Sequence, residues 1–446
     1  MDLDIHSIAN AFVALLLVVG AGCEEENKSE PSPTVVRGLV FDAETEAAIA
    51  GASAVIIDSG TMAAAAPVAI TNAAGEFSQE IVLAEGQSNL GFTVRVSAAG
   101  YRPFPEPPLR PAIPDSVDRG HTSAVVPVAL IADASLQGLG SISGKVLRSG
   151  IGESGMLVVA ASASDSCSTV TDTDGFYALR NVADGTWDVA ALKADLTRGE
   201  ASGVQVSGGA EVTGVDLLVA ADPPGWVTGT CNFVAGGSPP ASVVLFYPGT
   251  TEAVPGLGVE TSGAFAIEGV PDGTYDVLAT FDNDCNVLDP DTHLAHTAVQ
   301  RITVAGGEVA LDDPFNITDA IDLTGVWGGD ECDRDDGTIT TAEFVEGETV
   351  TFTWAAYPGS TEGYAIEVID VMGNVVWGGF EADGLPRQRF AKEILQVDYA
   401  GDALKPGLSY RWMLWALAND KDAPYGFRYI SSSENLRGLF EVHAGE

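Results

Sequence analysis

The sequence is short of positive charge and of the residue types that build most catalytic and metal sites. Among 446 residues there are 21 Lys and Arg against 63 Asp and Glu, a formal net charge of -42. Nucleic acids and anionic lipid surfaces are bound through clusters of Lys and Arg, so this balance argues against both as partners. Only five His and five Cys occur, and the HExxH, GxSxG and Walker motifs are missing. We therefore expect a protein that is not an enzyme.

Helical periodicity is also missing beyond the N-terminus. The chain instead has short alternating segments rich in Val and Thr, separated by turns that use many of its 51 Gly and 23 Pro. This composition is typical of short strands joined by tight turns. Hydrophobic residues make up 46% of the chain, which is ample for packed cores. The sequence predicts an all-β protein of tandem small antiparallel β-sandwich domains.

One stretch occurs twice in the same register. DGFYALRNVADGTWDV (174–189) matches GAFAIEGVPDGTYDV (263–277) at a constant offset of 88 residues. Each copy has a turn glycine, an alternating strand, Asp-Gly and a second alternating strand with an inward aromatic residue, which predicts a β-hairpin. An isolated hairpin is marginal in water, so each copy needs a surrounding sheet. We expect each hairpin inside a self-contained sandwich, and the sandwiches in a row of separate units.

The first 34 residues carry an export pattern. An apolar run over 11–21 is too short for an ordinary membrane span and fits the core of a signal peptide over 1–22. Small residues then precede Cys23 and Glu24. This arrangement resembles a bacterial lipoprotein signal, which implies a lipid on Cys23 and a place in the outer membrane or at the cell surface. An ordinary secretory signal or a short membrane anchor remains open, and residues 23–34 are predicted to be a flexible tether.

Residues 35–133 contain three segments in a recognisable order: Val36–Asp42 (VRGLVFD), Thr71–Phe77 (TNAAGEF) and Ser97–Tyr101 (SAAGY). This order resembles the carboxypeptidase regulatory-like domain, a small transthyretin-type β-sandwich. The resemblance implies a fold and does not imply catalysis. Residues 138–221 and 225–321 each contain one copy of the repeated stretch and are predicted to be second and third domains of this type.

The pattern changes over 322–446. LKPGLSY (Leu404–Tyr410) has the L-x-P-G-x-x-Y form that resembles the tyrosine corner of fibronectin type III domains, and Trp354 stands where that family has a core tryptophan. The resemblance implies a fibronectin type III-like or immunoglobulin-like sandwich. In such a corner the Tyr410 hydroxyl bonds the backbone a few residues upstream.

One acidic segment, Asp330–Phe344, has features of a metal site. Its second half resembles the end of an EF-hand calcium loop with Gly337 as the turn glycine. This alignment places three residues at ligand positions: Asp336, Thr340 and Glu343. Cys332 and Arg334 then fall at the first and third positions, where oxygen is needed. Calcium binding and a plain acidic linker therefore both remain open, and no other cofactor is expected.

Four cysteines follow Cys23, and export permits disulfides. Cys231 and Cys285 lie in the same predicted domain, which favours that pair. A bond between Cys285 and Cys332 is the alternative, and geometry rather than spacing decides between them.

Aromatic residues gather near the C-terminus, where Trp412 and Trp415 share a predicted strand. Because alternate residues of a strand face opposite sides, we expect that both cannot be in the core. An exposed indole there could stack on a sugar, and core packing is the alternative.

Taken together, the patterns predict an exported, lipid-anchored, non-enzymatic surface protein that acts as a binding or adhesion module. Carbohydrate is the first candidate ligand, because related sandwich folds often bind glycans. A structural spacer or docking subunit of an envelope complex is one alternative, and a calcium-stabilised adhesin is another.

Overall fold

The computed structural model is almost entirely β-structure. It describes residues 33–106, 110, 112, 114–221, 225–234, 241–250, 252–279, 286–288, 299–326, 341–423, 425–434 and 437–445. Within these ranges the one helical element is a 3-10 turn, η2 (Ala134–Leu136), capped by the Asp133 side chain. The predicted all-β class of tandem antiparallel sandwiches is confirmed.

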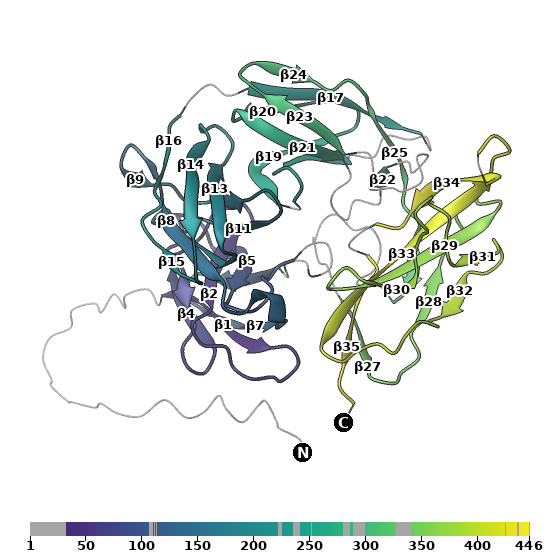
Figure 1. The fold of residues 1–446 in the computed structure, drawn as a ribbon, viewed down its shortest axis with the longest axis horizontal. Coiled ribbons are helices and arrows are strands. Elements are labelled where there is room, and N and C mark those ends of the chain that lie inside the picture. Colours follow the sequence, from purple (N-terminus) through teal and green to yellow (C-terminus); the bar gives the residue numbers. More distant parts are fainter. Residues whose placement is uncertain are drawn as a thin grey trace, which may run out of the picture. The chain divides into compact units, whose positions relative to one another are not determined.

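The first sandwich lies within residues 34–130 (Figure 1). Its strands are β1 (Thr34–Asp42), β2 (Ser53–Asp58), β3 (Ala69–Ile70), β4 (Glu76–Ile81), β5 (Asn89–Ser97), β6 (Asp115–Asp118) and β7 (Thr122–Leu130). They form two sheets with the orders β4-β1-β7 and β3-β2-β5-β6. β1 is antiparallel to β4 and parallel to β7. Alternate residues of both sheets point inward and form one apolar core.

The second sandwich lies within residues 140–219. Its strands are β8 (Gly140–Arg148), β9 (Ile151–Gly152), β10 (Leu157–Ala161), β11 (Ser166–Val170), β12 (Phe176–Val182), β13 (Gly185–Leu192), β14 (Gly199–Val206), β15 (Glu211–Val212) and β16 (Leu217–Val219). One sheet has the order β12-β8-β15, with β9 and β16 also paired to β8. The other sheet has the order β11-β10-β13-β14.

The third sandwich lies within residues 225–319. Its strands are β17 (Gly225–Phe233), β18 (Ala241–Phe246), β19 (Ala253–Thr261), β20 (Ala264–Val270), β21 (Gly273–Ala279), β22 (Asn286–Leu288), β23 (Gln300–Val304), β24 (Glu308–Ala310) and β25 (Phe315–Asp319). The sheets are β20-β17-β25-β22, with β24 also on β17, and β19-β18-β21-β23. The strand order of the first two sandwiches is thus repeated.

The repeated stretch does not form a hairpin, so this prediction is wrong. β12 pairs with β8, whereas β13 pairs with β10 and β14 in the opposite sheet. In the third sandwich β20 pairs with β17, and β21 pairs with β18 and β23. The two strands of each copy therefore lie in opposite sheets and face each other across the core. We call this strand–turn–strand unit an arch. Alternating apolar residues suit either arrangement, because both bury every second side chain.

The Asp-Gly pair of each copy supports this arch. The Asp184 carboxylate accepts hydrogen bonds from the backbone N–H groups of Gly208 (2.8 Å) and Gly209 (3.2 Å), which belong to the turn after β14. Asp272 accepts the equivalent bond from Gly306 at 2.7 Å. The aspartate thus accepts hydrogen bonds from a different loop. An Asp-Gly pair in the sequence is compatible with this role and with a hairpin turn.

The inward aromatic residue closes the same arch. The Trp187 indole N–H donates to the carbonyl oxygen of Ala183 at 2.9 Å, and the Tyr275 hydroxyl donates to that of Pro271 at 2.8 Å. Each bond spans four residues and crosses the arch. A buried aromatic ring with a bonded polar tip is the arrangement expected for Trp and Tyr in a core.

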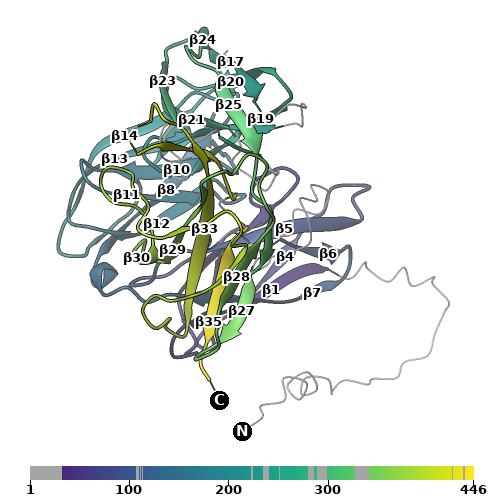
Figure 2. The same cartoon turned by 90° about the vertical axis from the view of Figure 1, so that its right-hand side faces the viewer.

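The last sandwich follows from residue 323 onward (Figure 2). Its strands are β26 (Leu323–Gly325), β27 (Ala342–Val345), β28 (Thr351–Trp354), β29 (Gly363–Asp370), β30 (Val375–Gly378), β31 (Arg389–Phe390), β32 (Gln396–Asp398), β33 (Leu408–Asn419), β34 (Phe427–Ser432) and β35 (Leu439–His443). One sheet is β26-β28-β32. The other is β27-β35-β33-β29-β30, with β31 also on β29 and β34 on β33.

The predicted tyrosine corner is present in this sandwich. The Tyr410 hydroxyl, at the start of β33, accepts a hydrogen bond from the backbone N–H of Lys405 at 2.7 Å. Trp354 is buried in the core on β28. The last sandwich therefore has the corner and core tryptophan that its sequence predicts.

At two junctions, neighbouring sandwiches share an apolar cluster. This sharing corrects the prediction of a row of independent domains. Four outward residues of the second sandwich belong to the apolar core of the third: Leu157, Val159, Ala190 and Leu192. Val55 and Ile57 of β2 pack with Val170 of β11 in a smaller cluster. Both faces of these strands are buried, because a neighbouring sandwich covers the face that alternation assigns to solvent.

Candidate functional site: polar contacts between the sandwiches

The predicted calcium ligands are only partly described by the structure. Glu343 is exposed on β27, whereas Asp336 and Thr340 lie outside the described residues. Among the residues with described positions, no group of three or more His, Cys, Asp or Glu side chains is placed to hold a metal ion. The calcium prediction therefore stays a prediction.

The cysteines give a similarly partial result. Cys231 is buried on β17, and its predicted partner Cys285 lies outside the described residues, as do Cys332 and Cys23. Cys167 on β11 forms no disulfide. Burial raises the pKa of the Cys167 thiol to about 12, so it stays protonated and unreactive at neutral pH.

The two tryptophans of β33 are both fully buried, at 0% exposure, so the prediction that one is exposed is wrong. Trp412 lies in the inner core and donates its indole N–H to the carbonyl oxygen of Val326 at 2.6 Å. Trp415 points to the other face of the sheet, where a second apolar cluster covers it. The sheet has an apolar layer on each side, which the alternation argument does not foresee. Neither ring can stack on a sugar in the described conformation.

Polar side chains instead gather where sandwiches meet, and Asn181 is the clearest case. Asn181 is in β12 of the second sandwich, but its amide bonds the turn that follows β5 of the first. Its Nδ2 donates to the carbonyl oxygens of Ala98 (3.1 Å) and Tyr101 (2.9 Å), and its Oδ1 accepts from Gly100 N–H at 2.9 Å. The amide thus joins two sandwiches through three backbone groups.

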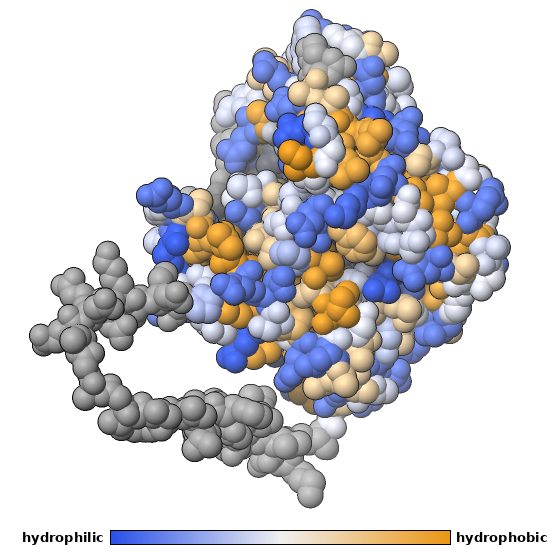
Figure 3. All heavy atoms as spheres, turned by 90° about the vertical axis from the view of Figure 1, so that its left-hand side faces the viewer, coloured by the Kyte–Doolittle hydropathy of each residue, from blue (hydrophilic) through white to orange (hydrophobic). Residues whose placement is uncertain are grey.

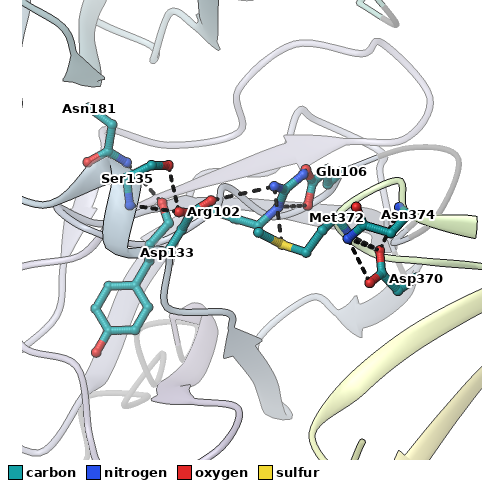
Figure 4. Close-up of polar contacts among 9 residues, drawn as sticks. Arg102, Glu106, Asp133, Ser135, Asn181, Asp370, Met372 and Asn374 are labelled. Atoms are coloured by element: carbon teal, nitrogen blue, oxygen red, sulfur yellow. Dashed lines mark hydrogen bonds and ion pairs between the residues drawn. The ribbon is translucent and has the colours of Figure 1, made fainter. Parts of the chain in front are cut away.

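Arg102 lies one residue beyond this turn and forms a charged cluster (Figure 4). Its guanidinium contacts both carboxylate oxygens of Glu106, with Nε at 3.0 Å, and lies 3.6 Å from the Asp133 carboxylate. Its Nη1 also reaches the Met372 sulfur of the last sandwich at 3.4 Å. Burial opposes the charge of Arg102, but the hydrogen bond and charge of Glu106 outweigh it, and the pKa of Arg102 is raised.

Asp133 in this cluster is held as a carboxylate. The Ser135 hydroxyl lowers the pKa of Asp133 most, and Arg102 lowers it further. The cluster therefore pairs the Arg102 cation with the Asp133 carboxylate, and this pairing positions backbone and side chains. Such groups do not exchange protons near neutral pH, so the arrangement supports a structural role.

A second ion pair lies at a junction of three sandwiches. Arg95 of β5 contacts Glu252, which precedes β19, through two hydrogen bonds of 3.0 and 3.1 Å. The Ser168 hydroxyl of β11 donates to the same carboxylate at 2.5 Å. Burial raises the pKa of Glu252, but the charge and hydrogen bonds of Arg95 outweigh it, and the net pKa is lowered. The bidentate geometry makes this a directional contact between domains.

The hollow beside this ion pair is too small for a ligand. A cavity of about 20 Å³ lies between the first two sandwiches and is lined in part by Arg95, Phe104 and Val170. This volume holds about one water molecule. The junction is therefore packed rather than open.

None of these contacts is signalled by the sequence. Asn181 has a φ of +59° inside a strand, a conformation that asparagine tolerates better than most residues. That value and the identity of the distant partners are properties of the folded chain. In the repeat, ALRNV aligns with AIEGV, so Asn181 is at the position of Gly269, which has a φ of +75°. A glycine aligned with an asparagine was the one available hint of a positive φ.

The surface shows no single large apolar area on the face drawn in Figure 3. Hydrophobic residues there form several patches divided by hydrophilic ones. Among the described residues, no helix is long and apolar enough to cross a membrane.

Comparisons with known proteins give no family for this chain. No family model matches it, and a search of curated proteins finds no match. Among solved structures, a cohesin–X-dockerin complex from Acetivibrio cellulolyticus is 23% identical over 18% of this chain and 58% of that one, with a TM-score of 0.16. The Bacillus anthracis TIE protein is 12% identical over 89% of this chain and 68% of that one, with a TM-score of 0.18. A streptococcal ancillary pilin is 10% identical over 64% of this chain and 99% of that one, with a TM-score of 0.19. At these TM-scores the likenesses carry no argument about function.

Proposed function

We propose that this chain is an exported, non-enzymatic surface protein whose joined sandwiches form a stiff scaffold for binding a partner. The observation that carries the proposal is the use of polar side chains to connect neighbouring sandwiches. Asn181 connects the first and second, and Arg95 with Glu252 and Ser168 connects the first, second and third. Shared apolar residues add to both junctions. Such connections limit domain motion and hold the outer faces in a defined relation.

Limited proteolysis of the chain from Glu24 onward tests the scaffold. We expect trimming of the N-terminal segment followed by one large resistant product that contains all four sandwiches. Proteases cut where the backbone opens locally, so a stiff array resists cleavage between its domains. Early release of single sandwiches under native conditions would contradict the proposal.

The first three sandwiches are proposed to be carboxypeptidase regulatory-like domains of the transthyretin type. Their support is the repeated strand order: when the two-residue β9 is left out of the count, the fourth strand of each sandwich pairs with the first, and the second lies between the third and fifth. The glycines of the first-strand pattern fit this assignment. A Cβ at Gly38 would lie 2.4 Å from the Phe77 ring, and one at Gly229 would lie 2.6 Å from the Phe265 ring.

The anchor is a separate part of the proposal. Lipidation of Cys23 would hold the scaffold at the outer membrane or cell surface, with residues 24–34 as the tether. Metabolic labelling with a palmitate analogue tests this directly. Label on the natural chain and none on Cys23→Ser is the expected result, whereas equal labelling of both would exclude this anchor.

A glycan array with the chain from Glu24 tests which class of ligand the scaffold binds. Binding to defined glycans would support the adhesion function, and silence across the array would favour a spacer or docking subunit. Calcium titration by calorimetry addresses the third possibility. Heat that disappears in Glu343→Gln would support a calcium-stabilised adhesin, and no heat would exclude it.

A further inference from the structure

The first three sandwiches present two kinds of surface to their neighbours. The trailing face is the outer side of two paired central strands: β2 with β5, β10 with β13, and β18 with β21. The leading edge is the edge strand of the same sheet, β3, β11 or β19, together with the strand that follows it in the chain. At the first junction, Val55 on the trailing face packs in one apolar cluster with Val170 of β11. Arg95, which is paired with Val55, donates to the Ser168 hydroxyl of β11 at 3.5 Å.

The second junction repeats this contact. The equivalent pair on the trailing face of the second sandwich is Val159 and Ala190, and both belong to the apolar core of the third. The turn after β13 then meets the leading edge of the third sandwich, where Asp195 N–H donates to the Gly269 carbonyl oxygen at 2.8 Å. Gly269 is at the position of Asn181, whose amide bonds the equivalent turn after β5 at the first junction. One docking geometry therefore occurs twice in the chain.

The third sandwich has a trailing face of the same construction. Its central pair is Val244 of β18 and Leu278 of β21, which have the strand pairing of the buried pair in the second sandwich. Both side chains are partly exposed. The last sandwich joins the third at the other sheet, where the Ser431 hydroxyl donates to the Asp319 carbonyl oxygen at the end of β25 at 2.6 Å. The chain therefore continues from a different surface of the third sandwich.

The first sandwich has a leading edge that is exposed to solvent. Ile70 of β3 and Val170 of β11 each directly precede the threonine of the T-x-x-x-G pattern, Thr71 or Thr171, so the two apolar residues are equivalent. Val170 is 7% exposed, because the trailing face of the first sandwich covers it. Ile70 is 55% exposed. The same apolar position is thus covered at one leading edge and open at the other.

We propose that the trailing face of the third sandwich binds the leading edge of the first sandwich in a second copy of this chain. The occupant follows from the two internal junctions, because a leading edge covers the trailing face at both of them. Ile70 of one copy would then pack on Val244 and Leu278 of the other. Each chain has one surface of each kind, so the contact is head to tail and repeats from copy to copy instead of closing at a dimer.

This inference rests on the proposed scaffold and extends it from one chain to a row of chains. The net charge of -42 on each copy sets the conditions for association. Copies of like charge repel one another, and salt screens this repulsion. The contact among Ile70, Val244 and Leu278 is apolar, so salt does not weaken it. We therefore expect association to tighten about threefold or more between about 50 and 500 mM NaCl.

Sedimentation velocity of the chain from Glu24, at about 1–300 µM in both salts, tests the assembly over the range of weak to moderate affinities. We expect the average mass of the natural chain to rise with concentration and not to level off at a dimer. Ile70→Glu disables the leading edge and Leu278→Glu the trailing face, so each variant alone should be monomeric. An equimolar mixture of the two should form dimers and nothing larger, because one intact surface of each kind remains.

Two further variants separate the contact from effects on folding. Ile151→Glu replaces another exposed isoleucine, on β9 of the second sandwich and outside both proposed surfaces. It should associate as the natural chain does. Leu278→Ala shortens the trailing-face side chain without adding a charge, so it provides a readout if Leu278→Glu fails to fold. We expect it to weaken association about tenfold, as the loss of a buried apolar contact does. Thermal melting followed by circular dichroism shows which variants are folded.

A natural chain that stays monomeric at the highest concentration in both salts would overturn the head-to-tail contact. Dimers formed by folded Ile70→Glu or Leu278→Glu alone would overturn it as well, because they would show a contact between like surfaces. The scaffold proposal would survive either result, since its own test is resistance to proteolysis between the sandwiches of one chain. Release of single sandwiches by protease, together with dimers in the mixture of variants, would give the opposite outcome. The two failures are therefore distinguishable.

Discussion

Replacing Asn181 tests the junction between the first two sandwiches most directly. Its amide makes three hydrogen bonds to backbone groups of the other sandwich, at 2.9–3.1 Å. A net contribution of about 1 kcal/mol for each gives about 3 kcal/mol for the side chain. Asn181→Gly keeps the backbone at its positive φ and removes the amide. Asn181→Ala removes the amide and leaves a residue that tolerates a φ of +59° less well than asparagine, which adds about 1 kcal/mol of strain.

The assay is urea unfolding of the chain from Glu24, followed by the fluorescence of the buried tryptophans. We expect Asn181→Gly to lower the free energy of unfolding by about 2–4 kcal/mol and Asn181→Ala to lower it by more. Proteolysis between the first two sandwiches should accelerate in both variants. Asn89→Ala, at an exposed position of β5, is the matched control and should stay within about 0.5 kcal/mol of the natural chain. If both Asn181 variants also stay within that range, the amide does not join the sandwiches and the reasoning is refuted.

Three further predictions concern the ion pair, the arches and the tyrosine corner. Arg95 lowers the pKa of Glu252 from 4.5, so the ion pair stabilises the fold above about pH 4.5, and this stabilisation is lost as the pH falls through the folded-state pKa. The free energy of unfolding of the natural chain should therefore fall on acidification. Glu252→Gln should have a lower free energy of unfolding at pH 7 and a smaller fall in acid. Trp187→Phe and Tyr275→Phe each lose one bond across an arch and should each lower the free energy of unfolding by about 1 kcal/mol in urea melts, and additive losses would be expected since the sites lie in different sandwiches. Tyr410→Phe should lower it by about 1–2 kcal/mol, and an unchanged urea midpoint would show that the corner is dispensable.

Much of the local structure is predictable because it depends on neighbouring residues. The Thr of the T-x-x-x-G pattern is an example. The Thr71 hydroxyl donates to the Ile49 carbonyl oxygen at 2.7 Å and accepts from Ala52 N–H at 2.9 Å. Thr171 makes the same pair of bonds in the second sandwich, to Glu153 and from Met156, at the same distances. The pattern therefore marks a real structural unit, as does the corner at Tyr410.

The partners of each strand were less predictable. β12 and β13 have the spacing, alternation and Asp-Gly link of a hairpin, but they belong to opposite sheets. A strand with one apolar face is equally satisfied beside its neighbour or across the core from it. The arrangement depends on which other strands are free to pair with β12 and β13. Those strands are β8, β10 and β14, and local spacing alone does not identify them.

The candidate sites were the least predictable part. Glu343 is exposed on β27, and the remaining proposed calcium ligands and Cys285 lie outside the described residues. Trp412 and Trp415 were recognised as a pair on opposite faces, but both are covered. The cover of Trp415 is the connection between β30 and β31, about 30 residues earlier in the chain. No sequence pattern marks Arg95, Arg102 or Asn181, because their role depends on partners that only the fold brings near.

By itself the sequence determined the strand-forming segments, the turns between them, the repeat and the acidic surface, because each follows from residue type and short-range spacing. Tertiary structure alone decided which sheet each strand joins, which outward faces are buried and which polar side chains connect the sandwiches. The physical reason is that these outcomes depend on which distant surfaces bury the most apolar area and satisfy the most polar groups together. Alternation records that a side chain faces away from its own core, but it does not record whether solvent, a loop or a neighbouring sandwich lies there.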